Sequence, residues 1–210
     1  NQHLLPVFLL VISQTTTYAQ QWKADTDSAR LYLQQKNNVK ALDFFLKAHE
    51  PLKNDSASTI HFYQNNTDIG DLYTAMGQYA KAEPYYTTAK ASIEQLQGKE
   101  NAPYALSCNN LGRLLRLMGQ YERSEPLLIE ARNIRAIIFG KENADYATSC
   151  NNLAVLYLEV GMYDSARPLY VEAMQIRERV LGKEHIDYAA SCNNLAILYV
   201  VTGKPSEAEP

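Results

Sequence analysis

Three near-identical stretches place a cysteine in front of two asparagines: SCNNLG begins at Ser107, and SCNNLA begins at Ser149 and again at Ser191. Three thiols could bind a metal ion, and a single activated thiol could act as a nucleophile. Side-chain amides could bind a ligand, because each amide both donates and accepts hydrogen bonds. Which of these chemistries is available depends on how the chain spaces the three copies.

The three copies belong to a repeat of 42 residues. The same spacing separates Gly77, Gly119, Gly161 and Gly203. A fixed period between roughly 20 and 50 residues is typical of a solenoid, in which each unit buries its apolar face on its neighbours. We therefore predict one or more degenerate units at 21–76, full units at 77–118, 119–160 and 161–202, and the start of a further unit at 203–210.

Each unit is predicted to contain two helices. In the unit that ends at residue 160, apolar residues recur at steps of three and four, which places them on one helical face: Tyr146, Cys150, Leu153, Tyr157 and Val160. Gly161 then ends the helix. The second helix begins near Tyr163, and its inner stripe is predicted to be Ala166, Leu169, Tyr170, Ala173, Ile176 and Val180. Gly182 closes this helix, and Asp187 is predicted to cap the next one.

These residues resemble the tetratricopeptide repeat (TPR) family over about residues 36–210. The small, aromatic and glycine positions of that pattern are occupied by Leu153, Ala154, Tyr157, Gly161, Tyr163, Ala166, Tyr170 and Ala173. The usual tryptophan position holds Cys150, a departure repeated at Cys108 and Cys192. The 42-residue length and the phrase GKEHIDYAASCNNLAILY are similar to kinesin light chain repeats and to arrays in bacterial multidomain proteins. The resemblance implies an all-α fold: a right-handed α-solenoid of stacked antiparallel helix hairpins that serves as a protein-interaction scaffold.

The repeat spacing argues against chemistry at the cysteines. Equivalent points on stacked hairpins are ~10 Å apart, whereas zinc ligands converge on one point and a disulfide needs Cα atoms closer than about 7 Å. A catalytic cysteine would need one particular base within reach, but this one is copied three times, and His185 occurs in the third unit alone. We expect small buried side chains at these positions and no metal. The sequence carries no cofactor-binding motif.

The asparagines are better candidates for a site. The resemblance implies that the first helix of each hairpin lines a concave groove, and that Asn110, Asn152 and Asn194 hydrogen-bond the backbone of an extended peptide. The alternative is that these amides only bond within and between hairpins. The candidate partner-binding residues are Asn109, Asn110, Arg113, Arg116, Asn151, Asn152, Val155, Asn193 and Asn194.

The same helical face changes character from unit to unit. Arg113 and Arg116 stand one helical step apart, and the next two units place Val155 and Leu158, then Ile197 and Val200, at the matching positions. A ligand with an acidic group beside apolar residues would fit this face. The alternative is that the two arginines form a solvated surface pair near Glu122.

Charge and composition exclude other partners. With 20 Lys and Arg against 23 Asp and Glu, the net charge of −3 does not favour nucleic acid, which needs a basic surface. The apolar run from Leu4 to Ile12 is too short to span a membrane, and it predicts a signal peptide at 1–20 and therefore export. Without such a leader the protein would be cytoplasmic.

Three functions remain open. The repeats could form a scaffold that binds a peptide or partner domain. They could instead be the regulatory region of a larger enzyme, such as a peptidase or sensor kinase, with its catalytic domain beyond residue 210. They could also form a structural array that stacks on copies of itself through an open C-terminal end.

Overall fold

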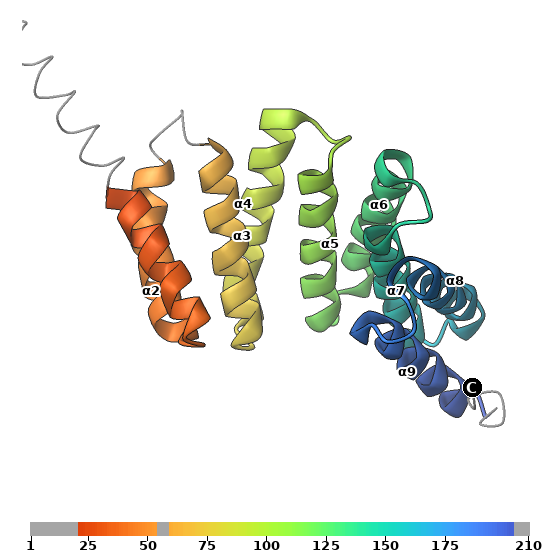
Figure 1. The fold of residues 1–210 in the computed structure, drawn as a ribbon. Helices are drawn as coiled ribbons and strands as arrows, with labels where there is room; N and C mark the ends of the chain where they lie inside the picture. The colour runs from red at the N-terminus through yellow and green to blue at the C-terminus, as the bar shows by residue number, and fades with distance from the viewer. Residues whose placement is uncertain (1–20, 54–58, 204–210) are drawn as a thin grey trace, which may run out of the picture. The chain divides into compact units, whose positions relative to one another are not determined.

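The computed structural model describes residues 21–53 and 59–203 (Figure 1). These ranges are helical and contain no strand, which confirms the predicted all-α fold of helix hairpins. The leader predicted at 1–20 and the repeat start at 204–210 lie outside the described residues. A first helix spans 21–34 and is followed by α2 (Asn38–Lys53), α3 (Thr59–Ala75), α4 (Tyr79–Gln97), α5 (Ala102–Leu117), α6 (Tyr121–Phe139), α7 (Ala144–Glu159), α8 (Tyr163–Leu181) and α9 (Ile186–Val201).

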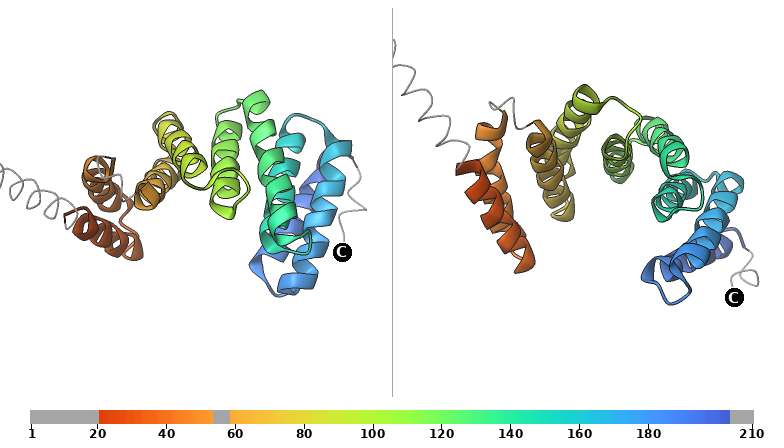
Figure 2. Two further views of the ribbon diagram at one scale, coloured as in Figure 1. Left: turned by 90° about the horizontal axis from the view of Figure 1, so that it is seen from above. Right: turned by 45° about the horizontal axis from the view of Figure 1, so that its top comes forward.

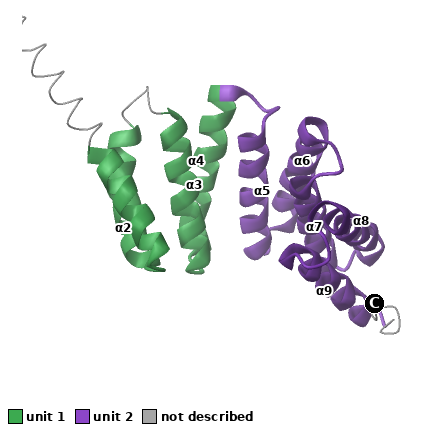
Figure 3. Ribbon diagram, viewed as in Figure 1, with its two compact units in different colours: residues 1–96 green, residues 97–210 purple. Residues whose placement is uncertain are grey.

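The chain forms two compact units, which Figure 3 colours separately: unit 1 covers residues 1–96 and unit 2 covers residues 97–210. In unit 2, α5 pairs with α6 and α7 pairs with α8, and α9 packs on α8. Figure 2 shows these helices, green to blue, from two further directions. The first helices of successive hairpins, α5, α7 and α9, also contact one another in sequence order.

The turn inside each hairpin depends on one backbone conformation. Gly161 has φ +81°, and its amide bonds to the carbonyl of Leu158. This left-handed conformation is open to glycine at no steric cost. The first hairpin of unit 1 reaches the same conformation without glycine, because Lys36 has φ +57° in the turn before α2. Lys36 therefore occupies the turn position in the first hairpin that Gly161 occupies in a later hairpin.

The caps of the first helices differ from the prediction. Asn101 and Asn143 cap α5 and α7 through their side-chain oxygens. For α9 the cap is His185, whose Nδ1 accepts from the backbone N–H of Asp187 at 3.1 Å. The predicted cap, Asp187, was wrong by two residues, because Asp187 already lies in the first turn of α9.

The core of unit 2 is built from small and aromatic residues on facing helices. Tyr146 and Cys150 of α7 pack on Ala173 and Ile176 of α8. A second cluster joins Ala154, Ala166, Tyr170 and Leu198. Two predicted members of the inner stripes are outside the core: Val160 is 38% exposed and Val180 is 45% exposed. Both lie at the end of a helix, Val160 at the C-cap of α7 and Val180 in the last turn of α8.

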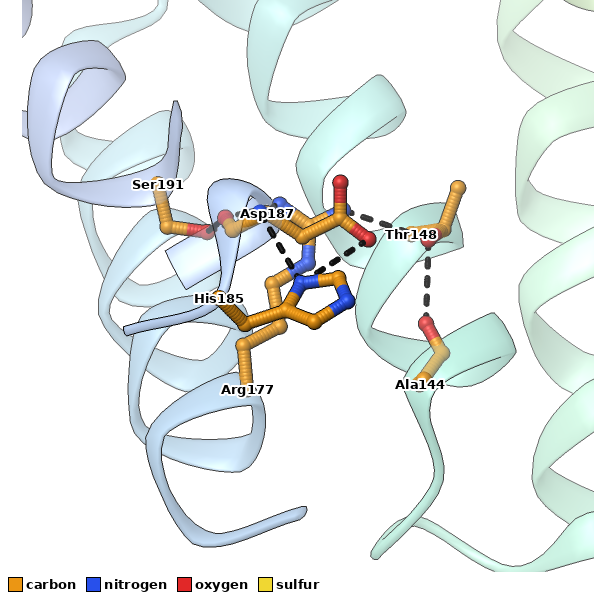
Figure 4. A network of polar contacts seen from close by, with 6 residues as sticks. All are labelled: Ala144, Thr148, Arg177, His185, Asp187 and Ser191. Carbon is orange, nitrogen blue, oxygen red and sulfur yellow. Dashed lines mark hydrogen bonds and ion pairs between the residues drawn. The ribbon is translucent and has the colours of Figure 1, made fainter. Parts of the chain in front are cut away.

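In unit 2, buried arginines join α6 to α7 and α8 to α9. Arg177 of α8 donates from Nη1 to Ser191 Oγ at 2.8 Å and to the carbonyl of Asp187 at 3.1 Å. Its Nη2 donates to Thr148 Oγ1 of α7 at 3.2 Å (Figure 4). One repeat earlier, Arg135 makes the same two Nη1 bonds, to Ser149 Oγ and the carbonyl of Asp145. We call this arrangement the arginine clamp.

The hairpins of unit 1 are joined by ring contacts and by one buried amide. Between ring centroids, Trp22 lies 4.9 Å from His61 and His49 lies 5.1 Å from Phe62. Such contacts are attractive over a range of offsets and tilts, unlike a hydrogen bond. Asn65 of α3 donates from Nδ2 to the carbonyl of Phe45 on α2 at 2.9 Å, and its Oδ1 lies 3.0 Å from His49 Nδ1. Unit 1 therefore combines ring contacts with a polar contact at a position that holds serine in each repeat of unit 2.

Candidate functional site

The asparagine pairs connect successive hairpins of unit 2. Asn152 Nδ2 on α7 donates to Asn109 Oδ1 on α5 at 2.7 Å. One repeat later, Asn194 Nδ2 on α9 donates to Asn151 Oδ1 on α7 at 2.9 Å. We call each such bond a rung: the second asparagine of one pair donates to the first asparagine of the preceding pair. The amides therefore bond between hairpins, whereas their binding of a peptide stays a prediction.

The rungs leave the acceptor side of these amides available. Asn152 and Asn194 each use their nitrogen in a rung, and within the described ranges no hydrogen bond occupies their Oδ1 atoms. Both side chains are partly exposed, so these oxygens can meet an external donor. Asn193 is fully on the surface, whereas Asn109 is buried and Asn110 nearly so, with Asn110 Oδ1 accepting from Asn109 Nδ2 at 3.4 Å.

The two candidate arginines have different surroundings. Arg116 forms an ion pair with Glu159 at the end of α7, so the alternative of a pair near Glu122 is wrong for this residue. Arg113 is exposed and has no ion pair within the described part of the chain. Arg113 is therefore the cation that this face offers to a ligand, while Arg116 joins two hairpins.

The apolar residues on this face also differ in how exposed they are. Val155 and Leu158 pack against the cluster around Tyr170 and belong partly to the core. Ile197 and Val200 on α9 are exposed. The face therefore presents a cation on α5 and apolar side chains on α9, with the amide oxygens on α7 and α9. We call the surface formed by Asn110, Arg113, Asn152, Asn194 and Ile197 the ladder face.

The cysteines have a structural role. Cys108 and Cys150 are buried, Cys192 is partly buried, and the three form no disulfide. The Cys150 thiol faces Glu172 at 3.6 Å, as Cys108 faces Glu130, so each thiol has a carboxylate neighbour as well as apolar packing. Burial raises the pKa of the Cys150 thiol, which disfavours the reactive thiolate.

The described ranges offer no metal site and no membrane span. No three histidine, cysteine or acidic side chains in them gather closely enough to hold a metal ion. Among the same residues, no helix is both long enough and apolar enough to cross a bilayer.

A further part of the rung system lies in unit 1. Asp68 lies one repeat before Asn110 and two repeats before Asn152. It lines a small pocket together with Thr26. Burial, with the nearby charge of Asp71, raises the pKa of Asp68 to about 6. The signal in the sequence was an acid at a position that otherwise holds asparagine.

Comparison with known proteins agrees with this architecture. The family model described as tetratricopeptide repeat matches residues 63–137, 105–179 and 145–210. Among solved structures, the chain is similar to BtubC (BKLC) from P. vanneervenii, with 20% identity and a TM-score of 0.76 over 93% of this chain and 85% of that one. It is also similar to a putative kinesin light chain from Podosopora anserina with nearly identical TPR-like repeats, with 22% identity and a TM-score of 0.73 over 89% of each chain.

A third similar structure is the apo form of RapI, with 16% identity and a TM-score of 0.76 over 89% of this chain and 66% of that one. At these identities the likeness shows the fold alone. No curated protein gives a significant match to the chain.

Proposed function

Because the chain belongs to the tetratricopeptide repeat family, whose fold is generally non-catalytic and typical of protein-interaction scaffolds, we propose that the ladder face of unit 2 binds an extended segment of a partner protein. The observation that carries this proposal is the row of amide oxygens on neighbouring helices, Asn152 Oδ1 and Asn194 Oδ1, whose nitrogens are already committed to the rungs.

The rungs determine which partner groups this row can bind. Because Nδ2 donates to the preceding hairpin, each amide is fixed in one orientation, and its Oδ1 is left as a hydrogen-bond acceptor. Packed helices lie about 8–10 Å apart, and three residues of an extended chain span about 10 Å. The two oxygens therefore lie within the length of a short extended segment that crosses the helices.

Charge and apolar surface then suggest the side chains of that peptide. Arg113 on α5 is exposed without an ion pair in the described ranges, and it would pair with an acidic residue. Ile197 on α9 is exposed and would contact an apolar residue further along. We therefore expect a segment that carries an acidic residue at one end and aliphatic or aromatic residues at the other.

A peptide selection tests this proposal. A random library of displayed dodecapeptides is selected on the purified chain, and affinities of the enriched peptides are measured by fluorescence anisotropy. We expect Arg113→Glu to weaken binding about tenfold or more, since it replaces a charge-assisted contact by repulsion. Ile197→Ser is expected to weaken binding by a smaller factor.

The matched control is Lys141→Glu, the same charge reversal at an exposed loop position away from the ladder face. If Lys141→Glu weakened binding as much as Arg113→Glu, a general charge effect would explain the data. If neither Arg113→Glu nor Ile197→Ser had an effect, the selected peptides would bind elsewhere, and the ladder face would lose its proposed role.

A further inference from the structure

Unit 1 contains a position equivalent to a rung. In unit 2 the first rung asparagine lies ten residues before the turn glycine, as Asn151 does before Gly161. The turn residue of the first hairpin is Lys36, and ten residues before it stands Thr26. Counted in the same way, Asp68 occupies the place of the donating asparagine. The pair Thr26 and Asp68 is therefore the unit 1 counterpart of a rung.

Thr26 and Asp68 do not form the hydrogen bond that a rung has in unit 2. No hydrogen bond joins Thr26 to Asp68 in the described ranges, and the buried Oγ1 of Thr26 has no hydrogen-bond partner there. Threonine is shorter than the asparagine found at this position in unit 2, and the ionised Asp68 has no N–H to donate. The substitution of both residues has removed the bond and left space between the two helices.

A small pocket occupies that space. It lies between the helix 21–34 and α3, and its volume of about 10 Å³ is room for one water-sized group. Its walls are Trp22, Thr26, Arg30, His61, Gln64, Asn65 and Asp68.

A second donor without a partner lines the same pocket. Trp22 is 5% exposed, and its Nε1–H has no hydrogen-bond acceptor in the described part of the chain. An indole nitrogen can only donate, and leaving a buried donor unpaired costs about 1–3 kcal/mol. Two buried groups on successive turns of one helix, Trp22 and Thr26, therefore require an acceptor that the described side chains do not supply.

Charge narrows the chemistry of that acceptor. Asp68 and its neighbour Asp71 are opposed by the single cation Arg30, so the pocket is negative at neutral pH. An entering carboxylate or phosphate would be repelled by Asp68. A group that fits must accept from Trp22 and Thr26 and also donate to the Asp68 carboxylate. In the space of one heavy atom, a hydroxyl does both, whereas a carbonyl oxygen cannot donate and an ammonium cannot accept.

We propose that this pocket is a second binding site, which receives a hydroxyl group of a ligand between Trp22, Thr26 and Asp68. The hydroxyl oxygen accepts from Trp22 Nε1–H and Thr26 Oγ1–H, and its proton is donated to Asp68. The hydroxyl comes from a serine or threonine of a peptide or from a small polyol. Phosphorylation of such a serine would prevent binding, because a phosphate is too large and carries the wrong charge.

The single tryptophan of the chain provides a direct readout. In a ¹H–¹⁵N spectrum of the labelled protein, Trp22 gives the one indole N–H signal. The probes are N-acetylserinamide, glycerol and, as the matched compound without a hydroxyl, N-acetylalaninamide. We expect a saturable downfield shift of the indole proton with N-acetylserinamide and none with N-acetylalaninamide. If glycerol bound with the same affinity as N-acetylserinamide, the site would be assigned to polyols. If glycerol bound more weakly, the site would be assigned to serine or threonine residues of peptides.

Variants then test the residues. Thr26→Asn restores an amide at the rung position, which would fill the pocket, and we expect it to weaken the response about tenfold. As a control, Asp27→Asn introduces an asparagine at the next position of the same helix, which is exposed and lies outside the pocket, and it should leave the response intact. Asp68→Ala removes the acceptor of the hydroxyl proton and should also abolish the response, which covers the case in which Thr26→Asn does not fold.

Three results would overturn the proposal. A shift of the same size with N-acetylalaninamide would show that the hydroxyl is not recognised. A response that survives both Thr26→Asn and Asp68→Ala would place binding elsewhere. No saturable shift with either hydroxyl compound would mean that the pocket holds an ordered water only.

Discussion

Unit 1 and unit 2 use the same helix hairpins but join them differently. In unit 2 the contacts between hairpins are polar and recur from one repeat to the next: the asparagine rungs and the arginine clamps. In unit 1 the hairpins are joined by ring contacts and by one amide, Asn65, which stands where unit 2 has serine, and the rung position is an open pocket. A hydrogen bond needs its donor within a few tenths of an ångström of one place, whereas ring contacts tolerate varied offsets.

The difference shows what a regular period contributes. Where the spacing is a constant 42 residues, equivalent side chains contact equivalent partners in the same geometry. A hydrogen bond that forms in one repeat can therefore form again in the next. Between the first two turns, Lys36 and Gly77, the spacing is one residue shorter, and the side chains have diverged. We infer that repeating the same polar bond from hairpin to hairpin depends on this regularity, and three substitutions test how much stability it provides.

The largest effect is expected from breaking an arginine clamp. Arg135→Ala removes two hydrogen bonds to α7, leaves the fully buried Ser149 hydroxyl without that partner, and deletes a packed side chain. We expect a loss of about 2–4 kcal/mol in the free energy of unfolding, measured by urea denaturation with circular dichroism at 222 nm.

The control for the clamp is Arg179→Ala, because Arg179 forms an exposed ion pair with Glu142 between hairpins. An exposed pair contributes at most about 1 kcal/mol. Equal losses for Arg135→Ala and Arg179→Ala would mean that burial of the clamp adds nothing.

A smaller effect, of opposite sign, is expected at the open rung. The folded-state pKa of Asp68 is about 6, above its ordinary value of 3.8, so the folded protein binds a proton that the unfolded chain has released. Stability therefore falls as the pH rises from about 4 to about 6 and stays low above that. Asp68→Asn, the residue found at this position in unit 2, should flatten this slope.

At pH 7 we expect Asp68→Asn to stabilise unit 1 by about 1–2 kcal/mol, a value reduced from the full shift because the carboxyl is partly exposed. Thermal unfolding at pH 4, 5, 6 and 7 measures it. An equal gain at every pH would point to packing or a new hydrogen bond and would exclude relief of the buried charge.

The smallest effect is expected from opening a rung in unit 2. Asn152→Ala removes one hydrogen bond between partly buried amides and should cost about 1 kcal/mol. Asn193→Ala is the matched control, since Asn193 is exposed and has no hydrogen bond in the described ranges. Urea midpoints of the two variants decide: if they coincide, the rung does not contribute to stability.

The fold was predictable because its signals are repeated. The 42-residue spacing, the turn glycines and the steps of three and four specified hairpins, and they placed Cys108 and Cys150 in the core. The tetratricopeptide family assignment is confirmed by the family match. The exposure of Val160 and Val180 was not predictable, because it depends on where a neighbouring helix ends.

The site was predictable in its residues but less so in its bonds. The sequence singled out the asparagine pairs, yet it could not show that nitrogen and oxygen of one amide face different partners. The pairing of Arg116 with Glu159 joins residues 43 apart, and it depends on the lateral contact between α5 and α7. The signal peptide, the enzyme-regulatory role and self-stacking stay predictions, as does peptide binding at the asparagines.

The rungs on the two sides of α7 are chemically the same, and this has a consequence for how the gene can change. A duplication or deletion of one 42-residue copy inside unit 2 would join identical partners again and leave every hairpin bonded. The same event across Thr26 and Asp68 would bring asparagine against threonine or aspartate and lose the match. Copy number is therefore free to vary in the regular region, whereas the hairpins that carry Thr26 and Asp68 cannot be exchanged in this way.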